Sequence, residues 1–240
     1  MLKDELIELY TQKNSNYNYM VFTRLYEERR KFFNLDFSYN NLDQILDFER
    51  YVIRNKGINR FGVEEKVLEF LQMLILDLCQ RFDTEYLLLN EKLINDTQDI
   101  KLKKLHQINF DLLNFAYELF NISIPRDSFS SRRKGYGLGI ISRLLNYYEI
   151  PNKFDLFFEG LKSSKDKLII EVLNELHYYH ENFPEEHLSG EIISELDRII
   201  LKTKNRNVAT GALNLQVITG YISEFEALSR IDVWKEKYYS

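Results

Sequence analysis

The chain has 240 residues, of which 45% are hydrophobic and 29% are charged. This composition is typical of globular proteins and excludes an intrinsically disordered chain and a collagen-like one. The net charge of −5 argues against broad nucleic-acid binding, because contacts with phosphates need a basic surface. Only 9 glycines and 3 prolines interrupt the chain, so an all-β fold with its frequent turns is not expected.

The first residues and the cysteine content indicate the compartment. Residues 1–6 lack the basic start and apolar run of a secretory signal. The longest apolar stretch, residues 67–79, contains Glu69 and Asp77 and is shorter than the roughly 20 residues that span a bilayer. Cys79 is the single cysteine and lies on an apolar helical face, which predicts a buried thiol. We therefore expect a cytoplasmic protein without a membrane segment.

Helical periodicity dominates the first 122 residues. Weaker patterns cover residues 2–10, 17–33, 42–53 and 84–94. A stronger one runs from Val63 to Leu78 and is wide enough to predict a central helix with neighbours on more than one side. Another runs from Leu105 to Leu119 as a single stripe. We expect residues 1–122 to form a helical bundle or degenerate repeats, within an all-α chain of about a dozen helices.

A basic segment, residues 123–137, follows and has two interpretations. It contains serines, glycines and four cations, whose side chains and neighbouring amides could hold a phosphate or carboxylate. Its spacing matches neither G-x-G-x-x-G nor a P-loop, and no strong strand precedes it. The alternative is a plain connection between two domains. The candidate anion-binding residues are Arg126, Arg132, Arg133 and Lys134.

The last part of the chain, residues 138–240, contains a repeat of about 40 residues. Leu173-Asn174 recurs as Leu213-Asn214, and the same offset places Leu188-Ser189 on Leu228-Ser229. Gly220 is suited to end a helix in the left-handed conformation, and Ser223 with Glu226 has the spacing of a capping box. Pro184 suits the first turn of the equivalent helix in the earlier unit. Each unit is therefore predicted to be a pair of helices.

This pattern resembles HEAT-like helical repeats, clearly over residues 163–240 and as a shortened pair upstream. The resemblance implies antiparallel helix pairs stacked into an α-α superhelix. It also implies an extended surface that binds another macromolecule, since many such repeats act as interaction platforms.

Acidic residues are concentrated in the first repeat unit. Residues 168–197 contain eight Asp and Glu and no Lys or Arg. Carboxylates without interspersed cations create a negative potential that a basic partner would relieve, although a merely solvated face is the simpler alternative. The candidate partner-binding residues are Glu171, Glu175, Glu181, Glu185, Glu186, Glu191 and Glu195.

Motifs for catalysis or metal binding are weak or missing. His177 and His180 are three residues apart on a helix, but this spacing alone is a poor zinc signal. The sequence has no G-x-S-x-G or H-E-x-x-H motif and no pair of cysteines. We expect no metal, no cofactor and no enzymatic activity.

The sequence therefore favours a non-enzymatic protein-protein interaction module that binds a basic protein through its acidic C-terminal repeats. A concrete form is a bacterial immunity protein that neutralises a cationic toxin, a class it loosely resembles. Two alternatives remain open. One is a nucleic-acid enzyme resembling the helical-repeat DNA alkylation glycosylases, which the acidic composition disfavours. The other is a binder of phosphate ligands that uses the cations of residues 126–134.

Overall fold

A computed structural model of the protein describes residues 1–12, 17–33, 39–55, 60–88, 100–124, 126–144, 154–185 and 187–239. These residues form eleven helices, and no strand occurs among them. The all-α prediction is therefore confirmed, as the scarcity of glycine and proline indicated.

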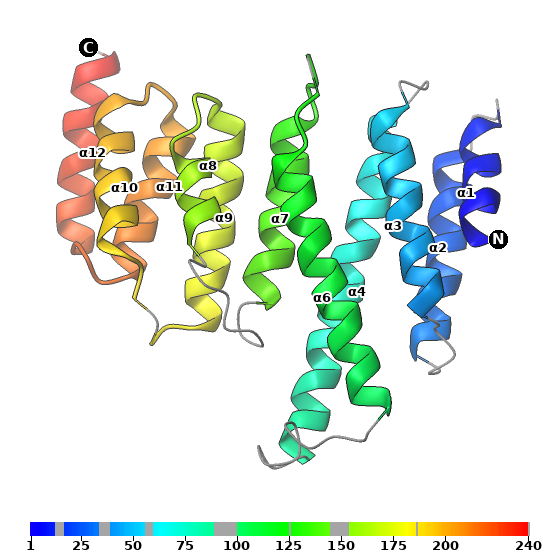
Figure 1. Ribbon diagram of the computed structural model, residues 1–240. Helices are drawn as coiled ribbons and strands as arrows, with labels where there is room; N and C mark the ends of the chain where they lie inside the picture. The colour runs from blue at the N-terminus through cyan, green and yellow to red at the C-terminus, as the bar shows by residue number, and fades with distance from the viewer. Residues whose placement is uncertain are drawn as a thin grey trace. The chain divides into compact units, whose positions relative to one another are not determined.

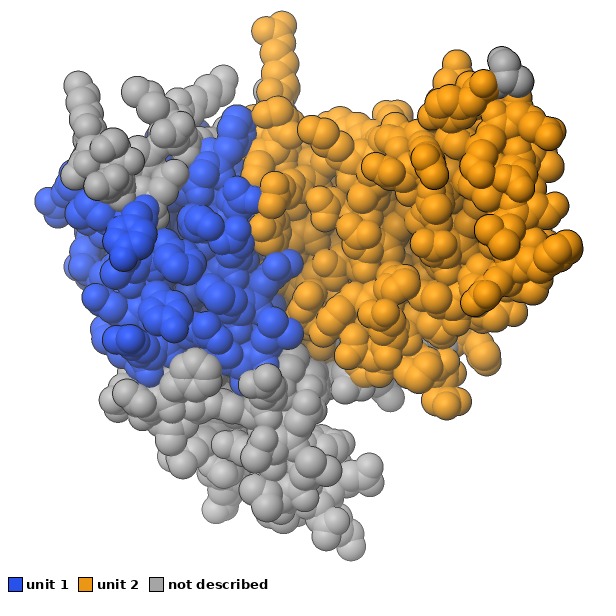
Figure 2. Space-filling view, turned by 180° about the vertical axis from the view of Figure 1, so that it is seen from behind, with its two compact units in different colours: residues 1–115 blue, residues 116–240 orange. Residues whose placement is uncertain are grey.

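The chain divides into two compact units, residues 1–115 and 116–240 (Figure 2). The division falls inside helix α6 (Ile100–Asn121) rather than at the predicted connection of residues 123–137. That connection is wrong from residue 130 onward, because residues 130–137 are the first half of helix α7 (Ser130–Leu144).

Unit 1 contains α1 (Leu2–Thr11), α2 (Tyr17–Phe33), α3 (Tyr39–Arg54) and α4 (Arg60–Leu88). Helix α4 packs against both α2 and α3, and α1 packs against both of them as well. Val63, Val67 and Leu71 of α4 are fully buried. The prediction that this helix is central, with neighbours on more than one side, is confirmed.

Unit 1 also buries charged groups, and each of those described next is paired. Asp77 of α4 accepts hydrogen bonds from Arg29 of α2 at 2.6 and 2.8 Å. Glu28 is fully buried beside Arg24, Lys31 and Asn41. Burial by itself would raise the pKa of Glu28, but hydrogen bonds from Lys31 and Arg24 outweigh it and hold the pKa below its usual value.

Unit 2 contains, beyond α7, the helices α8 (Asp155–Leu161), α9 (Asp166–Asn182), α10 (Gly190–Lys202), α11 (Arg206–Ile218) and α12 (Glu224–Tyr239). Helix α9 packs between α7 and α11, whereas α8 packs against α10. Successive helices from α8 onward are joined by short turns and run in alternating directions (Figure 1). They form the antiparallel helix pairs that the sequence predicts.

The predicted 40-residue offset is confirmed for the first helix of each pair but is wrong for the second. Helix α9 begins at Asp166 and α11 at Arg206, 40 residues later. The residues that precede α10 and α12 are Ser189 and Ser223, only 34 residues apart, since α11 has 13 residues where α9 has 17 and the following turn is also shorter. Ser229, the predicted equivalent of Ser189, lies inside α12 instead.

The turn between α11 and α12 has the capping contacts that its sequence predicts. Gly220 has a φ of 71°, the left-handed conformation that glycine adopts without strain. Its N–H donates to Val217 O, and the N–H of Tyr221 donates to Gln216 O, both at 2.9 Å, which satisfies the last carbonyls of α11. The Ser223 hydroxyl accepts from the N–H of Glu226 at 3.1 Å, as predicted. Pro184, however, lies in the turn before α10, so its predicted place in the first helical turn is wrong.

Candidate functional site

The predicted anion-binding segment contains a sealed ion pair. Arg126 lies in a turn with a φ of 59°, and three residues later Phe129 donates its N–H to the Asp127 carboxylate at 3.1 Å. The same carboxylate pairs with the Arg133 guanidinium at 2.7 Å, and both side chains are fully buried. Arg133 therefore joins the start of α7 to the preceding turn and cannot reach a ligand.

The other cations of this segment have different surroundings. Arg132 and Lys134 are two residues apart on α7, a spacing that points side chains to different sides of a helix. Lys134 Nζ lies 4.5 Å from the centre of the Phe120 ring. Arg126 and Arg132 are exposed. A cradle of all four predicted cations is therefore excluded by the burial of Arg133, and an anion-binding role for Arg126, Arg132 and Lys134 stays a prediction.

The glycines of the same segment pack helices together instead of forming a phosphate loop. A Cβ at Gly135 would lie 2.8 Å from the Cβ of Glu171 on α9. A Cβ at Gly137 would lie 2.8 Å from the carbonyl oxygen of Ala116. Only glycine fits at these contacts, so the glycine content reports close helix packing.

Three of the predicted partner-binding glutamates are turned into unit 2. Glu171 packs on Gly135, and Glu175 accepts hydrogen bonds from Ser142 at 3.0 Å and Arg143 at 3.2 Å. Glu195 is 6% exposed and accepts from Arg198 Nε at 2.7 Å. These three residues therefore do not belong to an open acidic face without cations. Their negative charge is offset by cations of α7 and by a cation that follows residues 168–197.

Among these three carboxyls, Glu171 has a pKa that is shifted by burial. Desolvation raises the pKa of Glu171, the nearby Arg132 opposes the shift, and the Glu175 carboxylate adds to it. The three-dimensional neighbours of Glu171 are thus a glycine, a cation and a second acid, none of which is adjacent in the sequence.

Five exposed carboxylates lie at one end of unit 2, which we call the acidic end and define as residues 181–191 and 219–226. His180 Nε2 lies 2.9 Å from the carbonyl oxygen of Ile218, which places the last turns of α9 and α11 side by side. These two turns contain no Lys or Arg. Glu186 lies outside the described residues. The exposed acids of the acidic end are Glu181, Glu185, Glu191, Glu224 and Glu226.

Helix electrostatics favour this location. Glu191 lies in the first turn of α10, and Glu224 and Glu226 lie in the first turn of α12, where the helix dipole stabilises negative charge. Glu226 also pairs with Arg230 at 2.7 Å. Glu185, Glu191 and Glu224 form no ion pair with a residue that the structure describes.

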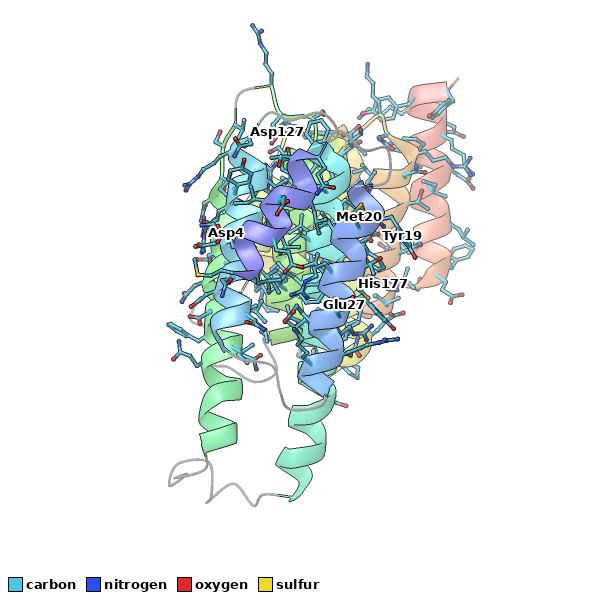
Figure 3. All side chains as sticks on the ribbon, turned by 90° about the vertical axis from the view of Figure 1, so that its right-hand side faces the viewer. Asp4, Tyr19, Met20, Glu27, Asp127 and His177 are labelled. Atoms are coloured by element: carbon cyan, nitrogen blue, oxygen red, sulfur yellow. The ribbon has the colours of Figure 1, made fainter. Side chains whose placement is uncertain are left out.

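The two histidines of the weak zinc spacing turn to different partners. His177 is hydrogen-bonded to Glu181 at 3.0 Å, whereas His180 contacts the carbonyl of Ile218 (Figure 3 labels His177). In the described parts of the chain, no three His, Cys, Asp or Glu side chains are grouped as metal ligands would be.

The apolar stretch of α4, which contains Glu69 and Asp77, is not a candidate membrane span. Within the ranges given above, no helix has both the length and the hydropathy needed to cross a bilayer. Cys79 belongs to α4, but its side chain lies outside the described residues, so its predicted burial stays a prediction.

Sequence reasoning missed a second charged region, at the opposite end of unit 2. Its cations occur in the turns 162–167 and 202–206, which flank the acidic stretch rather than interrupt it. The signal was present in the 40-residue repeat, because the offset that matches Leu173 with Leu213 also matches Lys162 with Lys202 and Ser163 with Thr203.

Comparisons with known proteins add a distant likeness. No protein-family profile matches the chain, and no curated protein matches it. A chain from a solved structure described as "TOG-tubulin binding specificity promotes microtubule dynamics and mitotic spindle formation" is similar over 100% of this chain and 86% of its own length. The two are 18% identical, with a TM-score of 0.49. The fold class therefore stands on the eleven helices themselves.

Proposed function

We propose that the protein is a non-catalytic protein-binding module whose acidic end receives a basic partner. One observation carries the proposal: the exposed carboxylates of two turns that lie apart in the sequence meet at one end of unit 2, in turns without Lys or Arg. Such a surface steers a cationic protein toward itself and fixes its orientation.

The residues assigned to this role are the exposed members of the predicted set, together with two from α12. Glu181, Glu185 and Glu191 come from the end of α9, the turn that follows it and the start of α10, and Glu224 and Glu226 come from the start of α12. Glu171, Glu175 and Glu195 are assigned to packing, because each contacts other groups of unit 2. Neutralisation of a cationic toxin by an immunity protein is one concrete form of this function.

A charge-reversal experiment tests the proposal. The full chain and its variant Glu181→Lys/Glu185→Lys/Glu191→Lys are titrated into a small cationic ribonuclease, and binding is followed by calorimetry at low and physiological salt. We expect the wild type to bind, and the variant to lose at least about tenfold in affinity and most of the salt dependence.

A matched control separates location from net charge. Asp4→Lys/Glu8→Lys/Glu27→Lys makes the same change in charge on exposed residues of unit 1, where Figure 3 shows Asp4 and Glu27. Affinity of this control should stay close to that of the wild type. Equal losses in both variants, or no loss in either, would contradict a role for the acidic end.

A further inference from the structure

Two turns at the end of unit 2 opposite the acidic end share one geometry. In the first, the N–H of Lys165 donates to Ser163 Oγ at 3.1 Å, and in the second the N–H of Asn205 donates to Thr203 Oγ1 at 3.0 Å. The Asn205 side-chain amide donates to Asp166 at 3.0 Å. The starts of α9 and α11 are therefore held side by side, and both turns face the same way.

These turns form what we call the basic end, residues 162–167 and 202–206. They carry six exposed cations and one acid. No ion pair to a described residue involves Lys202, Lys204 or Arg206. Their charge is therefore uncompensated within the part of unit 2 that the structure describes. The six cations are Lys162, Lys165, Lys167, Lys202, Lys204 and Arg206.

A groove of about 430 Å³ between α10 and α12 extends toward this end. Its apolar lining is Ile200, Leu201, Val233 and Trp234. Leu201 is 66% exposed and Val233 is 63% exposed, so these side chains offer a partner apolar surface that folding leaves in water. The volume lies within the range of pockets that hold small ligands, so the groove has room for an apolar side chain of a partner.

The polar lining of the groove leaves a net positive charge. Asp197 pairs with Arg230 at 2.8 Å and also accepts from Gln216 at 2.9 Å, so the charge of this partly exposed carboxylate is offset by Arg230. Lys237 lines the groove and donates to the carbonyl oxygen of Leu201 at 2.9 Å. Lys202 and Lys204 lie one and three residues after Leu201 and extend the positive charge beyond the groove.

We propose that the basic end and this groove together bind an acidic segment of another protein. The segment places one apolar side chain between Leu201 and Val233, and its flanking carboxylates meet Lys202, Lys204 and Lys237. The apolar lining distinguishes this occupant from a nucleic acid, whose phosphates need cations but no such groove. The site is independent of the acidic end and of its proposed partner.

The probe is a fluorescein-labelled peptide with one phenylalanine flanked on each side by three glutamates, and its binding to the full chain is followed by fluorescence anisotropy. We expect Lys202→Glu/Lys204→Glu to weaken binding at least about tenfold. Val233→Ser should weaken it several-fold without changing the charge. Replacing phenylalanine by alanine in the peptide should cost as much as Val233→Ser.

Controls and contrary results are defined for the same assay. Arg30→Glu/Arg54→Glu changes two exposed cations of unit 1 and should leave binding unchanged, as should Glu181→Lys/Glu185→Lys/Glu191→Lys at the acidic end. The proposal is overturned if the peptide does not bind at millimolar concentration or if the alanine peptide binds equally well. It is also overturned if single-stranded DNA or anionic vesicles compete better than the unlabelled peptide. Lysine-dependent self-association in sedimentation would assign the groove to a second copy instead.

Discussion

Helices α10 and α12 occupy equivalent places in two successive pairs but are held by different forces. Helix α10 buries five apolar side chains and Glu195, whereas Trp234 is the only residue of α12 that is fully enclosed. Helix α12 is fastened by polar contacts instead: Trp234 Nε1 donates to Thr203 O at 2.8 Å, and Lys237 and Tyr238 both donate to Leu201 O. Equivalent helices of successive pairs can therefore be stabilised mainly by apolar burial in one pair and by hydrogen bonds to backbone carbonyls in the next.

The largest expected difference between the two helices lies in their apolar side chains. Leu196→Ala in α10 removes a fully buried side chain, and we expect it to lower the free energy of unfolding by about 2–5 kcal/mol. Leu228→Ala in α12 removes a side chain that is 64% exposed and should change it by less than about 0.5 kcal/mol. Urea unfolding followed by circular dichroism measures both values. Similar losses of unfolding free energy in the two variants would contradict the difference between α10 and α12.

Removing the N-cap serine should destabilise α10 and α12 equally, in contrast to removing an apolar side chain. Ser189 accepts from the N–H of Ile192 at 3.3 Å, and Ser223 accepts from the N–H of Glu226 at 3.1 Å. Replacing either serine by alanine leaves one N–H of its helix without this acceptor, which costs about 1 kcal/mol. The same unfolding assay applies, with Ser229→Ala, inside α12, as the control that should cost less than half as much. A larger loss of unfolding free energy for Ser229→Ala than for Ser223→Ala would contradict this assignment. It would indicate that α12 is capped 40 residues after Ser189.

The smallest effect concerns the first pair alone, through its contact with α7. Because burial raises the pKa of Glu171, the folded state holds this proton more tightly than the unfolded state, and the stability contributed by the protonated form is lost as pH rises through the folded pKa. Glu171→Gln should therefore stabilise the protein slightly at pH 7 and not at pH 4. Unfolding free energies at the two pH values test this. Gly211 occupies the equivalent position of α11, so the second pair has no counterpart of this carboxyl.

Local signals in the sequence predicted most of the fold. Helical spacing located α4 and α6, and Gly220 and Ser223 fixed the turn between α11 and α12, because such turns depend only on residues close together in the chain. The 40-residue offset misplaced the start of α12, because α11 and the turn after it are shorter than α9 and its turn, whereas the local capping pattern at Ser223 placed it correctly. Helix α12 meets α10 at Arg230, which pairs with Asp197, and at Trp234, whose Nε1 donates to Thr203 O.

The candidate sites were harder to predict because their charges combine through space. Arg143 reaches Glu175 from another helix, and Arg133 finds Asp127 across a turn, so composition alone made one region too acidic and the other too basic. Conversely, the cations of the basic end appear in the sequence as two ordinary short turns. The hydrogen bond from Asn205 to Asp166 shows that they share one end, a relation that the 40-residue offset between Lys162 and Lys202 also indicates.

The contact between Trp234 and Thr203 gives the molecule a built-in optical reporter. Trp234 is the only tryptophan of the chain, and its indole lines the groove between α10 and α12. Emission excited selectively from indole therefore arises at this one seam. A red shift during gentle heating would register the detachment of α12 separately from the loss of ellipticity of the remaining helices.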